Sequence, residues 1–171
     1  MRLYIFLGLN KIKNKNMSIC KYDYDWILDD LAVGNIVAGS NLDNLLNHGI
    51  NVVICAIPTL PLPIEKYKQK GIILLHIPID DAPEVNIEKW FDHVSDFIMA
   101  NRLMGRKVLV HCHAGMSRST TLACSYIMNL LKWDEVKALY WMRDNRPCTN
   151  INPGFLRQLA HYGIKYKNVK Q

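Results

Sequence analysis

Short, nearly continuous apolar runs alternate along the chain with stretches in which apolar residues recur at helical spacing. Three runs are rich in β-branched residues and have the length of strands: NVVICAI (51–57), GIILLHIPI (71–79) and KVLVH (107–111). Strands without polar alternation are typical of a sheet that helices cover on both faces. A further strand is predicted over WILDDLAVG (26–34), and the short opening strands can pair antiparallel at one edge.

Capping residues mark the expected ends of the first helices. Ser40 is predicted to cap a helix over residues 41–47, which Gly49 ends. Asn86 is expected to cap the next helix. The apolar face of that helix is formed by Ile87, Trp90, Phe91, Val94, Phe97 and Ile98.

Three more helices are expected in the last third of the chain: residues 118–131, residues 134–145 opened by Asp134, and a last one opened by Pro153 and ended by Gly163. Strands that alternate with helices predict an α/β fold, here a single domain with a central, mostly parallel sheet of about four to five strands flanked by helices. Residues 1–16 are interpreted as an N-terminal extension and residues 17–171 as the domain.

Charge and composition narrow the class of protein. The 171 residues are 50% hydrophobic and carry a net charge of +6, which excludes wholesale disorder and favours anionic partners. The apolar run at 3–9 is too short for a membrane helix, so we expect no membrane span and a location in the cytoplasm, with the nucleus as the alternative. If this run docks on a second copy, the protein is a homodimer through its extension; otherwise it is a monomer.

Five cysteines lie along the chain without the C-x-x-C spacing of zinc sites. They are Cys20, Cys55, Cys112, Cys124 and Cys148. An odd number without a framework of spacings predicts neither a set of disulfides nor a metal site, and it favours a reducing compartment. We expect no metal ion and no cofactor.

Candidate chemistry gathers in VLVHCHAGMSRST (108–120), where a strand runs into a turn and then a helix. Ligands bind beyond the carboxyl ends of such strands, and Gly115 allows a backbone turn that aims several N–H groups inward. Arg118 adds a guanidinium that can bind two phosphoryl oxygens. This environment predicts that the pKa of Cys112 falls from about 8.5 into the range of roughly 3.5–7.5, which makes it a nucleophile. The alternative is a small buried side chain at a strand end.

The same residues resemble the signature of the cysteine-dependent protein tyrosine phosphatases. That signature is His-Cys, five residues, Arg, then Ser or Thr, and it stands here as His111, Cys112, His113, Ala114, Gly115, Met116, Ser117, Arg118 and Ser119. The flanking stretches HIPIDDAPEVNIEKWFDHVSDFI and RDNRPCTNINPGFLRQL are most similar to the small dual-specificity phosphatases. The resemblance extends from about Trp26 to Tyr162 and implies a protein tyrosine phosphatase-like fold.

The resemblance implies a role for each signature residue. Cys112 would attack phosphorus and form a phosphocysteine, while Arg118 and the loop amides would bind the other oxygens. Ser119 would assist thiolate departure, and His111 would brace the loop. The loop amides belong to His113, Ala114, Gly115, Met116 and Ser117.

The general acid and a supporting residue come from outside the signature. A proton donor for the leaving oxygen is needed, and Asp80 and Asp81 are the candidates. The family pattern, in which the acid falls five residues before the position of Asn86, selects Asp81. Asn152 resembles a family asparagine that supports the loop, although a plain helix cap would explain it as well.

Two further residues have candidate roles. Arg146 is a candidate second anion site for another phosphate or an acidic flank of the substrate, while its alternative is a cation that suits the end of a helix. Cys55 is a candidate redox partner of Cys112, as in some relatives, and its alternative is an inert buried thiol.

The predicted function is hydrolysis of phosphotyrosine and phosphoserine or phosphothreonine through a phosphocysteine, with phosphorylated proteins as substrates. One alternative keeps the chemistry and changes the substrate to an RNA 5′-triphosphate or a phosphoinositide; other nucleic-acid binding is not expected. A second alternative is a non-catalytic phosphate-binding module. Such modules usually lack the cysteine, the arginine or the acid, and all three residue types are present here.

Overall fold

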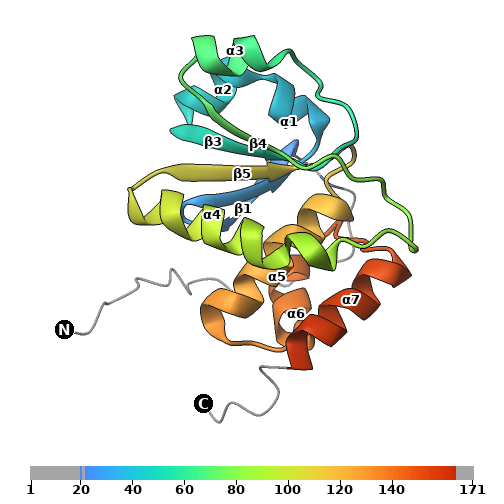
Figure 1. The fold of residues 1–171 in the computed structure, drawn as a ribbon. Helices are drawn as coiled ribbons and strands as arrows, with labels where there is room; N and C mark the ends of the chain where they lie inside the picture. The colour runs from blue at the N-terminus through green and yellow to red at the C-terminus, as the bar shows by residue number, and fades with distance from the viewer. Residues whose placement is uncertain (1–19, 21, 165–171) are drawn as a thin grey trace, which may run out of the picture.

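A five-stranded sheet forms the centre of the molecule in the computed structural model, which describes residue 20 and residues 22–164 (Figure 1). The strand order is β1-β2-β5-β3-β4, in which only β1 and β2 pair antiparallel. The strands are β1 (Tyr24–Leu28), β2 (Leu31–Gly34), β3 (Ile50–Cys55), β4 (Ile73–His76) and β5 (Lys107–His111). This arrangement confirms the predicted α/β fold with a mostly parallel sheet.

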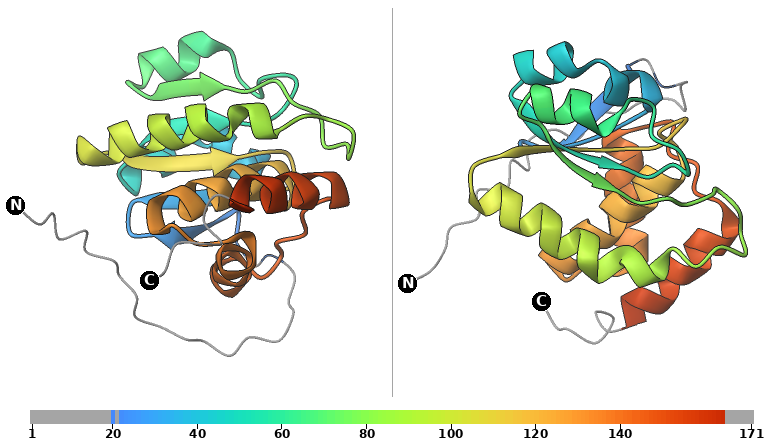
Figure 2. Two further views of the ribbon diagram at one scale, coloured as in Figure 1. Left: turned by 60° about the horizontal axis from the view of Figure 1, so that its bottom comes forward. Right: turned by 45° about the horizontal axis from the view of Figure 1, so that its top comes forward.

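Helices cover both faces of the sheet (Figures 1 and 2). One face carries α1 (Ile36–Ser40), α2 (Leu42–Asn47) and α3 (Ile64–Gln69). The other carries α4 (Phe91–Leu103), preceded by the short 3₁₀ helix η1 (Glu88–Trp90), together with α5 (Arg118–Leu131) and α6 (Glu135–Asn145). The last helix, α7 (Pro153–Gly163), packs against α5.

The apolar run of β5 is continuous because this strand is buried on both faces. Val108 and Val110 belong to the larger core cluster under α4 and α5, whereas Leu109 belongs to the smaller cluster under α1–α3. Helix α5 is enclosed as well, since every residue from 118 to 128 is buried. A central strand and a central helix therefore hold the loop between them from both ends.

Two local predictions are wrong. The single strand expected over 26–34 is a hairpin, in which a turn at 29–30 lets β1 pair back onto β2. Ser40 does not cap α2; Asn41 does, with its side-chain oxygen accepting from the N–H of Asn44 at 3.1 Å. Ser40 instead ends α1, which the sequence patterns did not predict, and its hydroxyl donates to the carbonyl of Ile36.

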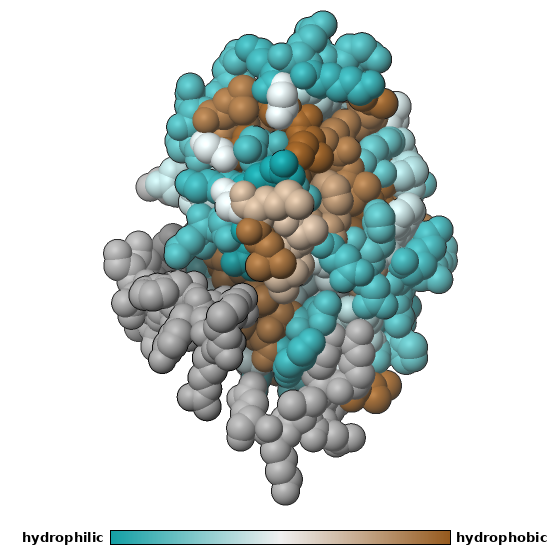
Figure 3. Space-filling view, turned by 60° about the vertical axis from the view of Figure 1, so that its left-hand side comes forward, coloured by the Kyte–Doolittle hydropathy of each residue, from teal (hydrophilic) through white to brown (hydrophobic). Residues whose placement is uncertain are grey.

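The surface mixes apolar and hydrophilic residues. Figure 3 brings forward the side of the molecule at which β5 begins, where brown apolar patches lie between teal hydrophilic ones. None of the helices in the described ranges is long and apolar enough to cross a membrane. The predicted extension, residues 1–16, lies outside the described residues.

Candidate active site

The cysteine loop, residues 112–118, leaves the carboxyl end of β5 and leads into the first residue of α5 (Figure 1). The strand and the helix begin and end where the sequence predicts. Because β5 is flanked by β2 and β3, the loop lies at the middle of the sheet edge, where neighbouring strands end beside it.

The sulfur of Cys112 accepts two hydrogen bonds, one from the cysteine loop and one from the first turn of α5. The N–H of Gly115 and the hydroxyl of Ser119 both lie 3.2 Å from Sγ. Cys112 is only 1% exposed, so water does not compete for the sulfur. Hydrogen bonds from N–H and O–H groups stabilise negative charge on their acceptor, so both donors are placed to stabilise charge that develops on this sulfur during a reaction.

Glycine is required at position 115. Its φ of +69° lies in the left-handed region, which residues with a Cβ rarely adopt. A Cβ there would also lie 2.6 Å from the carbonyl oxygen of Gly34, at the end of β2. Glycine at position 115 therefore allows these two backbone segments to approach each other closely.

The guanidinium of Arg118 lies at the same site. Nη1 donates to the carbonyl of Ile79 at 3.2 Å, and Nε lies 3.7 Å from Oδ2 of Asp81. Nε is buried and has no hydrogen-bond partner in the described part of the chain. A buried, unpaired N–H group is costly, which fits a group that binds an anion when one is present.

Asp81 is held at the site through one of its two carboxyl oxygens. Oδ1 accepts from the hydroxyl of Ser117 at 2.6 Å and from Nδ2 of Asn152 at 2.7 Å. Both donors use Oδ1, which leaves Oδ2 on the side of Arg118. The structure therefore brings Asp81, the aspartate selected by the resemblance, to the cysteine loop.

Asn152 caps a helix and also contacts the cysteine loop, so the structure places it where both interpretations of the sequence put it. Its side-chain oxygen accepts from the N–H of Phe155 at 2.9 Å and so caps α7. Its backbone N–H donates to the hydroxyl of Ser117, and its amide group contacts Asp81. One residue thus ties α7, the cysteine loop and the acid together.

Helix α7 also fixes the acid loop, residues 80–87, through residues that the sequence analysis missed. A Cβ on Gly154 would lie 1.9 Å from the carbonyl oxygen of Pro83, so the two backbones are in direct contact. The side chain of Gln158 accepts from the N–H groups of Ile87 and Glu88 and donates to the carbonyl of Val85. The signal available in the sequence was the spacing of Asn152, Gly154 and Gln158 along one helix end.

His111 lies on the strand side of the cysteine loop. The ring is fully buried against Gly39, where a Cβ would lie 2.4 Å from ring atoms, and Nδ1 lies 3.4 Å from the carbonyl oxygen of Cys112. Burial lowers the pKa of His111 to about 4, so the ring is neutral at pH 7 and Nδ1–H can donate to that oxygen. A neutral, enclosed ring suits the bracing role that the resemblance implies.

The sequence matches those of known proteins over most of its length. A family model for the dual specificity phosphatase catalytic domain matches residues 32–165. The chain belongs to the dual-specificity phosphatase family. It is 40% identical over 139 residues to human dual specificity protein phosphatase 15, covering 80% of this chain and 45% of that protein. The chain thus spans less than half the length of this relative.

Solved structures agree with the sequence matches. A crystal structure of DUSP15 superposes with a TM-score of 0.76 at 34% identity, covering 84% of this chain and 90% of that one. A human protein described as tyrosine phosphatase-like and serine/threonine/tyrosine-interacting gives a TM-score of 0.75 at 32% identity, covering 84% and 97%. The second of these is described as phosphatase-like, so similarity of fold alone does not establish catalysis.

Arg146 does not form the second anion site that the sequence suggested. Its side chain is fully buried, with Nη1 paired to Asp25 at 2.6 Å and Nε donating to the carbonyl of Gly115 at 2.7 Å. A guanidinium enclosed behind the loop cannot reach a phosphate on the substrate side. The position of Arg146 near the end of a predicted helix does not indicate that its side chain is buried.

Cys55 lies at the end of β3, paired in register with His111. Burial raises the pKa of its thiol to about 12, so at neutral pH it is a protonated, weakly nucleophilic group. Its role as a redox partner of Cys112 stays a prediction.

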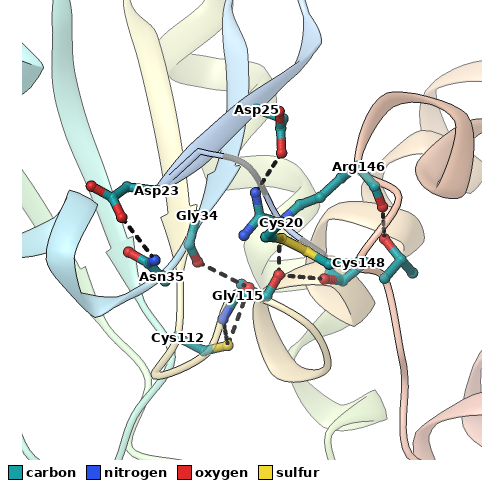
Figure 4. Close-up of a disulfide and its surroundings, with 12 residues drawn as sticks. Cys20, Asp23, Asp25, Gly34, Asn35, Cys112, Gly115, Arg146 and Cys148 are labelled. Carbon is teal, nitrogen blue, oxygen red and sulfur yellow. Dashed lines mark hydrogen bonds and ion pairs between the residues drawn. A yellow bond between two sulfur atoms is a disulfide. The ribbon is translucent and has the colours of Figure 1, made fainter. Parts of the chain in front are cut away.

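The expectation that the cysteines form no disulfide is wrong for one pair. Cys20 and Cys148 are joined across 128 residues of sequence, with their Cα atoms 5.0 Å apart, close to Arg146 and Gly115 (Figure 4). Such a pairing depends on the fold, which brings Cys20, before β1, beside Cys148, after α6.

Within residues 20 and 22–164, no group of three His, Cys, Asp or Glu side chains could hold a metal ion.

Proposed function

We propose that this chain hydrolyses phosphomonoesters on phosphorylated proteins by forming a phosphocysteine at Cys112. One observation carries the proposal: a buried sulfur accepts hydrogen bonds from Gly115 and Ser119 in a loop that also meets a guanidinium and a carboxyl group. This combination supplies a nucleophile, an anion-binding group and a proton donor at one place.

In the first step, the Cys112 thiolate attacks phosphorus as the bond from phosphorus to the leaving oxygen breaks. The N–H groups of the cysteine loop and the Arg118 guanidinium bind the three remaining oxygens and stabilise their charge in the transition state. Asp81 gives its proton to the leaving oxygen, so that an alcohol or phenol departs. Oδ2 suits this transfer, because Ser117 and Asn152 both donate to Oδ1.

In the second step, a water molecule attacks the phosphocysteine and the bond between sulfur and phosphorus breaks. The Asp81 carboxylate accepts a proton from this water, which restores the acid, and inorganic phosphate is released. The hydroxyl of Ser119, 3.2 Å from Sγ, donates to the thiolate as it departs. The sulfur returns to its ionised state and a new cycle can begin.

The substrates we propose are phosphotyrosine and phosphoserine or phosphothreonine in proteins, in keeping with the family. A polyphosphate such as an RNA 5′-triphosphate would gain from a second cation facing the substrate, and the buried Arg146 does not supply one. Location in the cytoplasm, and the choice between monomer and homodimer, stay predictions.

Replacing the acid tests the proposal with a matched control beside it. Asp81→Asn should slow hydrolysis of an aryl phosphate with a poor leaving group by about 10²–10⁴-fold and slow one with a good leaving group much less. The control is Asp80→Asn, which removes the neighbouring exposed carboxylate and should leave both rates unchanged. Equal slowing of both substrates, or a larger effect of Asp80→Asn, would contradict the assignment.

Replacing the nucleophile tests the substrate class. Cys112→Ser should abolish turnover while still capturing phosphorylated proteins or peptides in a pull-down. Competition by inorganic phosphate should release them. Turnover that survives this substitution would refute the role of Cys112, and capture of RNA 5′-triphosphates in preference to phosphopeptides would refute the substrate class.

A further inference from the structure

Arg146 and Asp25 form a buried ion pair behind the cysteine loop. The two residues are 121 positions apart, with Asp25 on β1 and Arg146 directly after α6. The Arg146 side chain is fully buried and that of Asp25 is 20% exposed. Figure 4 shows the guanidinium between the Asp25 carboxylate and Gly115. Removing charges from water costs several kcal/mol per ion, so burial of such a pair is weak evidence for a purely stabilising role.

The contact that Arg146 makes with the loop is directed at the residue that faces the sulfur. Nε of Arg146 donates to the carbonyl of Gly115 at 2.7 Å, while the N–H of the same glycine donates to Sγ of Cys112 at 3.2 Å. Holding the carbonyl outward fixes the left-handed backbone of Gly115, and this conformation turns its N–H inward. The guanidinium also occupies the space of a side chain, since a Cβ on Gly115 would lie 2.5 Å from Nη2.

Arg146 begins a segment that follows the loop residue by residue. In this support segment, residues 146–152, the side chain of Arg146 reaches Gly115, the N–H of Asn150 reaches the carbonyl of Met116, and the N–H of Asn152 reaches the hydroxyl of Ser117. Thr149 holds the Arg146 carbonyl through its hydroxyl and its N–H. The segment therefore lines the back of the anion-binding turn.

Charge acts in the same direction as geometry. Burial lowers the pKa of Arg146, and the electrostatic interactions with Asp25 and Cys112 oppose that shift. An arginine remains protonated in proteins, so its positive charge lies behind the turn that holds the sulfur. The carboxylate of Asp25 offsets part of this positive charge. The effect of Arg146 on the loop therefore depends on the direction in which its N–H groups point as well as on its charge.

We propose that Arg146, oriented by Asp25, is a positioning residue that sets the Gly115 N–H toward Cys112 and the bound phosphoryl group. The proposal rests on the proposed function, because it assigns to the pair a task in that same site. It replaces the second anion site as the role of Arg146. The partner in this role is the loop backbone, and the substrate is not contacted.

The test measures the reactivity of Cys112 and the binding of an anion, neither of which requires turnover. Arg146→Met keeps an unbranched apolar stem and removes the guanidinium with its N–H donors and its charge. It should lower the rate of Cys112 alkylation by iodoacetate at pH 6.5 at least tenfold, move the midpoint of the alkylation pH profile upward, and weaken tungstate binding in calorimetry about tenfold or more. Arg143→Met, which removes an exposed cation at the end of α6, is the matched control and should change neither quantity.

Asp25→Asn separates positioning from charge. If the pair acted through net charge alone, loss of a negative carboxylate would strengthen tungstate binding. The proposal instead expects weaker binding and slower alkylation, because the guanidinium loses the partner that orients it. Unchanged or tighter tungstate binding by Asp25→Asn would overturn the proposal, as would wild-type alkylation and tungstate binding in Arg146→Met.

If Arg146→Met does not fold, Arg146→Lys keeps the charge and one donor and is measured in its place. The expectation is then a smaller loss in both quantities, and wild-type values in both would overturn the proposal. Failure of the proposed function is distinguishable from this result. Wild-type protein that hydrolyses no phosphomonoester, yet loses tungstate binding in Asp25→Asn and Arg146→Met, would refute the activity and support the positioning role.

Discussion

Removing the hydroxyl of Ser119 should separate the two chemical steps. In Ser119→Ala the sulfur of Cys112 keeps the hydrogen bond from the Gly115 N–H, and the loop amides still bind the phosphoryl oxygens during the attack. The departing thiolate of the second step, however, loses the hydrogen bond from the Ser119 hydroxyl, which lies 3.2 Å from the sulfur. Ser119 is fully buried and Cys112 is 1% exposed, so water does not replace the lost donor. The breakdown of the phosphocysteine should therefore become the slow step.

The size of the effect follows from the kind of hydrogen bond that is lost. A hydrogen bond to a charged group contributes about 1.5–3 kcal/mol, which corresponds to about a ten- to 150-fold slower second step. In stopped-flow measurements with nitrophenyl phosphate, the variant should release one equivalent of nitrophenol per enzyme in a burst, followed by a slow steady state.

A second buried serine on the same helix provides the control. The hydroxyl of Ser125 donates to the carbonyl of Leu122 at 2.9 Å, away from the cysteine loop. Ser125→Ala removes a buried hydroxyl from α5 in the same way and should leave the burst and the steady-state rate as in the wild type. A Ser119→Ala enzyme without a burst, or with an unchanged steady-state rate, would refute the role of this hydroxyl.

Three further predictions concern the scaffold around the site. Gly154→Ala places a methyl group 1.9 Å from the carbonyl oxygen of Pro83, so the free energy of unfolding from thermal melts should fall by about 1–3 kcal/mol, and turnover of substrates with poor leaving groups should slow. The control is Gly163→Ala, whose methyl group meets the movable ends of side chains and should have a smaller effect. Equal effects of the two substitutions would contradict the importance of the contact with Pro83. Because burial lowers the pKa of His111 from 6.5 to about 4, the unfolded chain binds a proton that the folded chain does not in that window. The free energy of unfolding should therefore fall by up to about 3 kcal/mol as the pH drops from 6.5 to 4. In His111→Gln, denaturant titrations over the same pH range should lack this decrease. If the variant lost as much stability over this range as the wild type, the result would contradict a neutral His111 ring. Cys148→Ser removes a disulfide that spans 128 residues, so the free energy of unfolding should fall by about 2–4 kcal/mol and should no longer depend on added reductant. A variant as stable as the oxidised wild type would contradict a stabilising crosslink.

The cysteine loop and the two elements that flank it could be predicted from the sequence because their residues are close together in the chain. The strand over 107–111, the cysteine loop and the helix over 118–131 form one continuous stretch, with an apolar run at one end and a phosphate-binding pattern after it. Asp81 could be selected only through the family pattern, because two adjacent aspartates have the same chemistry. What distinguishes them is their contact with Ser117 and Asn152, and contacts across the fold leave no mark in local spacing.

The predictions were wrong for residues whose partners are far away in the sequence, because local spacing does not indicate such contacts. Arg146 is a cation near a helix end in the sequence, yet β1 places Asp25 beside it and encloses it. Cys20 and Cys148 carry no motif, and their pairing depends on two segments that meet only after folding. The hairpin of β1 and β2 was interpreted as one strand because its turn is only two residues long, although the antiparallel pairing expected at one edge of the sheet is confirmed.

The most direct test of the account is to look for the covalent intermediate. Acid quenching of Ser119→Ala during turnover, followed by mass spectrometry of the peptides, should find one phosphoryl group on the peptide that contains Cys112 and locate it on the sulfur. The intermediate should be absent from Cys112→Ser treated in the same way. Turnover that continues while no phosphoryl group is found on the protein, or a phosphoryl group found on a different residue, would contradict the central role of Cys112.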